Sequence, residues 1–148
     1  MDRFKFRIWY NGDYSLTPFC NLDRNGNVWL FYSENDEDME LCDGIDITDK
    51  CTVEFSTGLK DENGNLIYEG DIINCYRYSY VKRKNVDHKY VVKFGEYDQD
   101  GSDDEYGPSK CVGFYADDGE GRYNSTTSIL ALKEKIQIIG NVHKGEQK

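Results

Sequence analysis

The sequence predicts a mostly β fold that is rich in hairpins and has little helix. Aromatic residues make up 14% of the 148 residues, with twelve Tyr and seven Phe, whereas Met is scarce. Aromatic side chains favour the half-buried surface of a pleated sheet. Asn-Gly pairs at 25–26 and 63–64, each between apolar stretches, are typical of hairpin turns. We therefore expect an all-β protein whose short strands close into a small barrel, because closure removes exposed strand edges.

The length sets the expected domain organisation. A chain of 148 residues is the size of one ordinary domain and can bury a core without metals or disulfides. We therefore expect a single domain over residues 1–148. A second organisation stays open, in which two β lobes meet near residue 50.

Three segments predict the opening strands. Residues 4–10 alternate apolar and basic side chains with a period of two, as the two faces of a strand require. Residues 16–22 are apolar but contain Pro18, which suits an edge or a bend. Residues 28–32 form an aromatic strand after Asn25-Gly26, which predicts a type I′ turn.

The stretch from residue 54 to residue 73 organises the centre of the chain. Two short strands flank its Asn63-Gly64 turn, and Asp61 repeats the turn chemistry of Asp23, since Asp side chains bond their own backbone. Asp71 stands at the start of the next strand, where it can accept backbone N–H bonds. The stretch is therefore first a folding device that fixes strand register.

The second half continues with strands and one short helical segment. Ser128 can cap one or two helical turns, and residues 143–148 read as a polar tail. The expected strands cover residues 72–80, 89–94, 112–116 and 136–142.

Charge and cysteine content exclude several classes of protein. The net charge of −10 repels phosphate backbones, which disfavours a general nucleic-acid role. The first residues hold no apolar signal segment, and the sequence has no run of eighteen apolar residues that could span a membrane. The five cysteines include no C-x-x-C pair. We expect a reduced, cytoplasmic protein.

Two acidic segments, residues 34–50 and 96–107, raise the question of cation binding. An EF-hand loop that begins at Asp98 needs Gly at its sixth position and Glu at its twelfth, where this chain has Asp103 and Ser109. We expect exposed loops, with no metal site and no cofactor. Cation binding by these acidic loops stays open.

A basic and aromatic hairpin over residues 76–93 is the alternative site. Basic residues among tyrosines can form a platform for single-stranded nucleic acid. The same alternation is typical of a half-exposed β-hairpin, which the acidic balance of the chain favours. The candidate contacts are Arg77, Lys82, Arg83, Lys84 and Lys89.

Catalytic motifs are missing from the sequence. It has two histidines, neither in an informative setting, and no phosphate-binding glycine loop. A hydrolase with paired carboxylates stays open as a second alternative, because 28 acidic residues make pairs inevitable. We expect a protein that is not an enzyme. The central stretch offers four binding candidates with an expected structural role: Thr57, Asp61, Glu69 and Asp71.

Three segments resemble the YopX family of small proteins carried by bacteriophages and prophages. The central one, residues 56–72, reads S-T-G-L-K-D-E-N-G-N-L-I-Y-E-G-D-I, and residues 5–9 and 138–142 are similar to the opening and closing strands of the family. The resemblance implies a mostly β fold with a small barrel in the cytoplasm of a bacterial host. It implies no activity and no site residues.

These observations lead to one functional expectation. We expect a non-enzymatic phage accessory protein that binds an unidentified host or phage protein. Nucleic acid and membranes are not expected as partners, and a homo-oligomer stays open.

Overall fold

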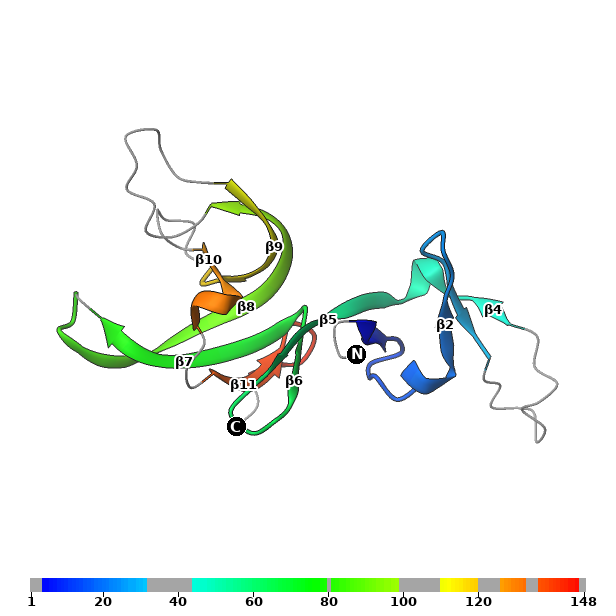
Figure 1. Ribbon diagram of the computed structural model, residues 1–148. Coiled ribbons are helices and arrows are strands. Elements are labelled where there is room, and N and C mark those ends of the chain that lie inside the picture. Colours follow the sequence, from blue (N-terminus) through cyan, green and yellow to red (C-terminus); the bar gives the residue numbers. More distant parts are fainter. Residues whose placement is uncertain are drawn as a thin grey trace. The chain divides into compact units, whose positions relative to one another are not determined.

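The computed structural model describes residues 4–31, 44–79, 81–98, 110–119, 126–132 and 136–146 (Figure 1). These residues are mostly β, as predicted, and their helical segments are short 3-10 turns. The chain divides into two compact units. The smaller unit is Phe6–Phe55, and the larger unit combines Met1–Lys5 with Ser56–Lys148. The single domain expected over residues 1–148 stays a prediction, because the division into two units does not show which parts fold independently.

The smaller unit is built from short antiparallel strands. β2 pairs with β3 and β3 with β4, while β1 pairs with the first residues of β5. Its elements are β1 (Phe6–Trp9), η2 (Thr17–Phe19), β2 (Cys20–Leu22), β3 (Val28–Leu30), β4 (Ile45–Asp46), η4 (Thr48–Lys50) and the start of β5 (Thr52–Lys60).

A small apolar core holds the smaller unit together. Its buried members are Ile8, Cys20, Val28, Leu30 and Ile47. Ile8 is fully buried because the predicted alternation of residues 4–10 turns it inward.

The opposite face of β1 carries a buried ion pair in the smaller unit. The Arg7 Nε lies 2.8 Å from a Glu54 carboxylate oxygen, and the Tyr14 hydroxyl donates to the same oxygen at 2.7 Å. The Arg7 guanidinium also stacks over the Tyr14 ring. These bonds satisfy the carboxylate of Glu54, which is only 3% exposed.

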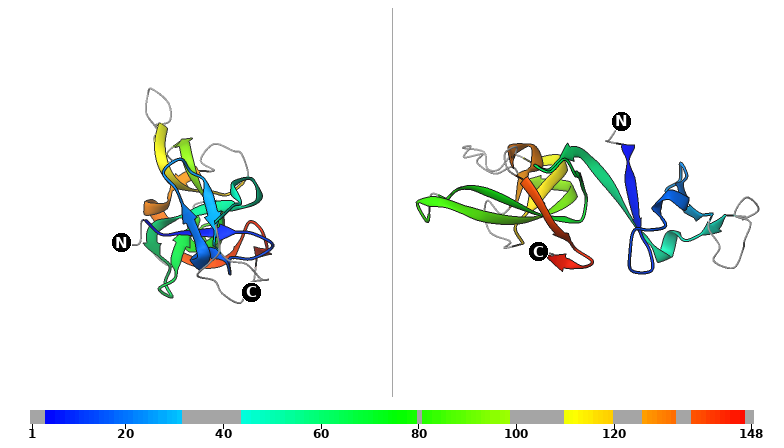
Figure 2. Two further views of the ribbon diagram at one scale, coloured as in Figure 1. Left: turned by 90° about the vertical axis from the view of Figure 1, so that its right-hand side faces the viewer. Right: turned by 90° about the horizontal axis from the view of Figure 1, so that it is seen from below.

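The larger unit is organised around a six-stranded antiparallel sheet with the strand order β10-β9-β8-β7-β11-β12. A long hairpin of β7 and β8 extends from this sheet (Figure 2). The remaining residues of β5 pair with β6. The elements are β6 (Leu66–Tyr68), β7 (Asp71–Ser79), β8 (Lys84–Asp98), β9 (Lys110–Asp117), β10 (Thr126–Ser128), η5 (Ile129–Leu132), β11 (Ile136–Asn141) and β12 (Gly145–Glu146).

The core of the larger unit lies on one face of this sheet. It joins residues from β6, β7, β8, β9, η5 and β11, so segments distant in sequence depend on one another. The buried members are Ile67, Ile73, Cys75, Tyr90, Val92, Ala116, Ile129, Leu132 and Ile136.

The strands β8 and β9 are strongly curved (Figure 1). Gly95 and Gly113 lie opposite each other, with φ of 151° and 154°. Residues without a Cβ adopt these values readily, and glycine inside a strand often marks such a bend. The Tyr97 and Tyr115 rings stack at 4.9 Å, close to the pair.

The expected barrel is not supported by the described residues. The six-stranded sheet begins at β10 and ends at β12, and these two edge strands do not pair with each other. The sheet is therefore open. The twist and the glycine bend curve it without closing it.

Several local predictions are corrected by the structure. Asn25-Gly26 is not a type I′ turn, because only Gly26 has a positive φ and the loop has three residues. The two-residue turn with both φ values positive is instead Asn11-Gly12. The tail is not merely polar, since β12 pairs with β11. Most of the acidic segments 34–50 and 96–107 lies outside the described residues.

Candidate functional site

Three of the four candidates in the central stretch, Thr57, Asp61 and Asp71, bond to the backbone around them. The Thr57 hydroxyl donates to the carbonyl of Ile67 at 2.9 Å and accepts from the N–H of Leu59 at 3.1 Å. Thr57 thereby fixes β5 against β6 where the pairing register shifts.

Asp61 closes the turn between β5 and β6. One carboxylate oxygen accepts the N–H groups of Asn63 and Asn65 at 3.0 and 2.8 Å. The other accepts the N–H of Ile138 in β11 at 3.3 Å. Asp61 is only 7% exposed, so these bonds replace its hydration.

Asp71 and Glu69 belong to the turn between β6 and β7. The Asp71 carboxylate accepts the N–H of Tyr68 at 2.8 Å, which confirms its expected role at a strand start. Gly70 supplies a positive φ of 87° in that turn, and Glu69 is partly buried beside it. The structural interpretation of Thr57, Asp61 and Asp71 therefore has direct geometric support.

The predicted basic and aromatic hairpin is divided between two faces. Directly opposed residues of an antiparallel pair point to the same side. The register Cys75↔His88 and Arg77↔Val86 places Arg77 on the face that carries the core. Tyr76, Tyr78, Asp87 and Lys89 occupy the opposite face, and Lys82, Arg83 and Lys84 surround the turn.

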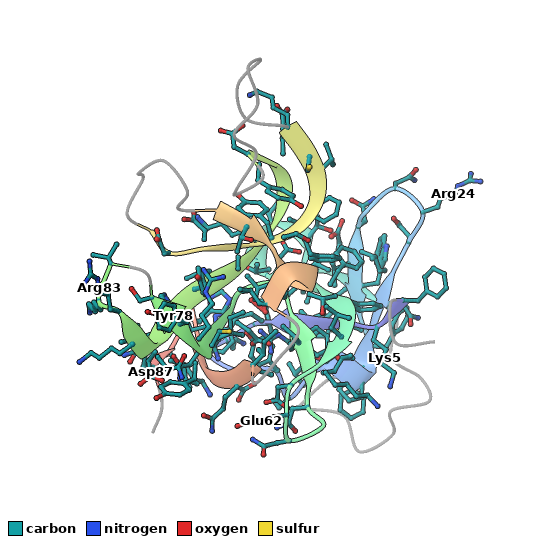
Figure 3. The ribbon with its side chains drawn as sticks, turned by 60° about the vertical axis from the view of Figure 1, so that its left-hand side comes forward. Lys5, Arg24, Glu62, Tyr78, Arg83 and Asp87 are labelled. Carbon is teal, nitrogen blue, oxygen red and sulfur yellow. The ribbon has the colours of Figure 1, made fainter. Side chains whose placement is uncertain are left out.

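The outer face of this hairpin is exposed and mixed in charge. Tyr76 and Tyr78 are each 48% exposed, and Figure 3 shows Tyr78, Arg83 and Asp87 on the hairpin. Lys89 is bonded to Glu146 of β12 at 2.9 Å, and Asp87 accepts a bond from Asn74. The tyrosines of the outer face therefore do not form one continuous platform with the basic side chains of the hairpin.

The inner face of the hairpin holds a polar cluster that sequence reasoning missed. Arg77 donates to the Tyr90 hydroxyl at 2.7 Å, and the rings of His88 and Tyr90 stack at 6.4 Å. Cys75 lies directly across from His88. The alternation of residues 72–80 could have revealed this set, but only with the register of the hairpin known.

Burial shifts the ionisation of this cluster. Desolvation lowers the pKa of His88, and the nearby Arg77 charge lowers it further. Burial raises the pKa of the Cys75 thiol and of the Tyr90 hydroxyl, and in both cases Arg77 opposes the shift. Cys75 is therefore a protonated thiol near neutral pH, as an inert buried cysteine should be.

A second feature missed by sequence reasoning is an apolar groove in the larger unit. It has a volume of about 250 Å³. Phe114 packs edge to face against Phe94, whose side chain is 56% exposed. Val112, two residues before Phe114 in β9, is 75% exposed. The groove is lined by Thr57, Leu59, Tyr97, Val112, Gly113, Phe114, Ser128 and Ile129.

The groove adjoins an open edge of the sheet. β10 pairs with β9 only at Tyr115, Ala116 and Asp117. The chain then leaves the edge at Ile129, where η5 begins. Within the described residues, positions 110–114 of β9 therefore have no strand on that side.

Among the residues that the structure describes, no three His, Cys, Asp or Glu side chains form a metal-binding group. No helix there is long and apolar enough to cross a membrane.

Together, the fold and these surfaces define a mostly β protein with an open sheet edge beside an apolar groove. The chain belongs to the YopX family, because the family described as YopX protein matches residues 5–146. The match covers nearly the whole chain and confirms the resemblance found in the three sequence segments. Comparison with curated proteins and with solved structures gives no match.

Proposed function

We propose that this YopX protein is a non-enzymatic binding module that takes up an extended, basic segment of another protein along β9. The observation that carries the proposal is the edge of residues 110–114, which no described strand pairs, beside the apolar groove. An open edge offers backbone donors and acceptors in register, and an adjacent groove selects alternate side chains. The partner would be a protein of a bacterial host or of a phage, and the chain itself would be a phage accessory protein.

The size of the groove favours side chains over a small molecule. Sites for small molecules usually measure roughly 300–1,000 Å³. A groove of about 250 Å³ falls below that range. One or two apolar side chains of an added strand would fill it and cover Val112 and Phe94, which are unusually exposed for their types.

Charge indicates what kind of segment would bind. Outside residues 76–93 the chain carries a net charge of −15. At the open edge, Glu96 pairs with Lys110 at 3.3 Å, but both side chains are more than half exposed. Such a surface pair contributes at most about 1 kcal/mol, so a basic residue of a partner can replace Lys110 at little cost. A basic partner strand is therefore complementary.

A defined peptide selection tests this proposal. A random peptide library is selected on the intact chain, and the affinities of the enriched peptides are measured by fluorescence anisotropy. We expect alternating apolar and basic residues. Val112→Asp should weaken binding by at least about tenfold, because the added strand would have to bury a carboxylate where the groove now offers an apolar side chain.

Val81→Asp is the matched control, since Val81 is 94% exposed in the turn between β7 and β8. It should leave the affinity unchanged. Equal binding by both variants, or enriched peptides without basic residues, would overturn the proposal.

A nucleic-acid role is the second candidate, and one observation favours it. Residues 76–93 contain six Lys or Arg and one Asp, a net charge of +5. A gel-shift series at low salt tests this role. Binding that is lost in the Lys82→Gln, Arg83→Gln, Lys84→Gln triple variant would support it, and no binding at micromolar protein would remove it.

The carboxylate hydrolase has no geometry in its favour in the described residues. Asp61 and Asp71, the most suggestive acids of the sequence, accept backbone N–H groups. A general acid or base would need a carboxyl group that faces a substrate.

A further inference from the structure

The register of the β7–β8 hairpin gathers three polar side chains on its inner face. Ile73 lies across from Tyr90, and Arg77 lies four pairs further towards the turn. His88 occupies the pair between them. Since alternate residues of a strand share a face, Arg77, His88 and Tyr90 point to the same side of the sheet. This side also carries the core of the larger unit.

Arg77 is held in place by Tyr90, and no acid in the described part of the chain pairs with it. Its guanidinium donates to the Tyr90 hydroxyl at 2.7 Å and lies 5.8 Å from the centre of the Tyr90 ring. None of the described carboxylates lies within ion-pairing distance of it. A partly buried guanidinium usually pairs with an acid, because taking a charge out of water is costly.

His88 adds an unused hydrogen-bonding atom. Its Nε2 is buried and has no hydrogen-bond partner in the described structure. Nearly all buried polar atoms have a partner, so such an atom calls for a ligand or water. The ring is fixed by its stacking on Tyr90, with an angle of 19° between the planes.

Charged groups of both signs act on the cluster. Arg77 and Lys82 act on His88 from the hairpin, and Asp87 opposes them from the same strand. Asp118, which follows β9, acts on Tyr90. An incoming anion would therefore meet Arg77 and Lys82 together with Asp87 and Asp118, and of these four Arg77 is the one with a described hydrogen bond inside the cluster.

We propose that Arg77, His88 and Tyr90 form a binding site for a phosphoryl oxyanion. The planar guanidinium of Arg77 has further N–H donors that match a tetrahedral anion. The hydroxyl of Tyr90 keeps its own proton to donate, since its oxygen accepts from Arg77. Protonated His88 would donate from Nε2. The anion thus satisfies the orphaned nitrogen and the unpaired cation together.

The two histidines of the chain make the site measurable. His88 belongs to the cluster, and His143 lies after β11, so their Cε1–H signals in NMR give a probe and an internal control. Inorganic phosphate is titrated at constant ionic strength against chloride. We expect phosphate to raise the pKa of His88 by about one unit, because a nearby negative charge favours the imidazolium. The His143 signal should respond equally to phosphate and to chloride.

Arg77→Gln should abolish the phosphate-dependent shift of His88, whereas Arg83→Gln in the exposed turn should retain it. The comparison uses the difference between phosphate and chloride, because removal of Arg77 alters the pKa of His88 by itself. Tyr90→Phe keeps the buried ring and serves if Arg77→Gln fails to fold; it should reduce the shift. Equal shifts of both histidines, or a shift retained in Arg77→Gln and Tyr90→Phe, would overturn the site.

Parallel titrations identify the source of the phosphoryl group. A nucleoside monophosphate that acts at lower concentration than inorganic phosphate indicates a nucleotide ligand and supports the site. Acetate that acts as strongly as phosphate overturns the assignment to phosphoryl groups. The Val112→Asp variant should respond like the unaltered chain, so this site and the proposed function can fail separately.

Discussion

Two turns with the same sequence pattern serve different purposes in the two units. Asp23-Arg-Asn-Gly-Asn27 joins β2 to β3 in the smaller unit, and Asp61-Glu-Asn-Gly-Asn65 joins β5 to β6 in the larger unit. In both, the first Asp accepts the N–H groups two and four residues later, and the glycine has a φ near 83°. Arg24 and Glu62 mark the exposed tips of the two turns (Figure 3).

The second carboxylate oxygen separates the two turns. In Asp23 it accepts the indole N–H of Trp29 at 3.1 Å, six residues away. In Asp61 it accepts the N–H of Ile138, which is 77 residues away. The first turn therefore stabilises its own hairpin, whereas the second also ties that hairpin to β11. The same local hydrogen bonds form in both turns, but only Asp61 is buried against a distant strand, and there the turn also has a tertiary role.

The largest effect is expected at Asp61. Asp61→Ala leaves three backbone N–H groups without their acceptor in a site that is 7% exposed. We expect the unfolding free energy of the larger unit to fall by about 3 kcal/mol. Both histidines lie in this unit and both tryptophans in the smaller one, so histidine NMR signals and tryptophan fluorescence in urea separate the two.

Asp23→Ala is the matched control for Asp61→Ala. It should affect the tryptophan transition, and by less, because Asp23 is only partly buried. Equal losses in the two variants would show that the bond to Ile138 contributes nothing.

A second substitution tests β11, the strand whose Ile138 N–H donates to Asp61. A Cβ at Gly140 would collide with the backbone of Gly145 and Glu146 in β12, which cannot move aside as a side chain can. We expect Gly140→Ala to cost about 2 kcal/mol and to displace β11. Because Ile138 lies in the same strand, the double variant with Asp61→Ala should lose less than the two single losses together. Simple additivity in urea unfolding would contradict the coupling.

The glycines of the two turns should behave alike. Gly26 and Gly64 have φ of 84° and 82°, and a Cβ at either position meets no atom within 4 Å. Substitution by Ala therefore adds only the strain of the left-handed conformation, about 1–2 kcal/mol in each turn. Urea unfolding followed with the two probes measures both values. A much larger loss at Gly64 would mean that the turns already differ locally, before tertiary contacts are made.

The sequence predicts what is local in this comparison. The hairpins at Asp23 and Asp61 follow from side chains that bond their own backbone, and Ile8 is buried as the alternation of β1 requires. The bond from Asp61 to Ile138 depends on the order of strands in the sheet, which no local pattern encodes. The same reason explains why Arg77 and His88 were not linked: they meet only once the register of β7 and β8 is set.

The smallest effect concerns the ionisation of Asp23. The indole N–H of Trp29, and next the backbone N–H of Asn27, hold the pKa of Asp23 below the ordinary range of an aspartate. Because the folded pKa is lowered, the stabilisation is complete above the pKa of the unfolded chain and is lost as pH falls through the folded value. In a Trp9→Phe background, the fluorescence of Trp29 should therefore change at a pH below the usual aspartate value, and Asp23→Asn should remove that step. A step at the usual value or above it would mean that Trp29 does not bond the charged carboxylate, and the smaller unit would then lack the one contact that distinguishes its turn.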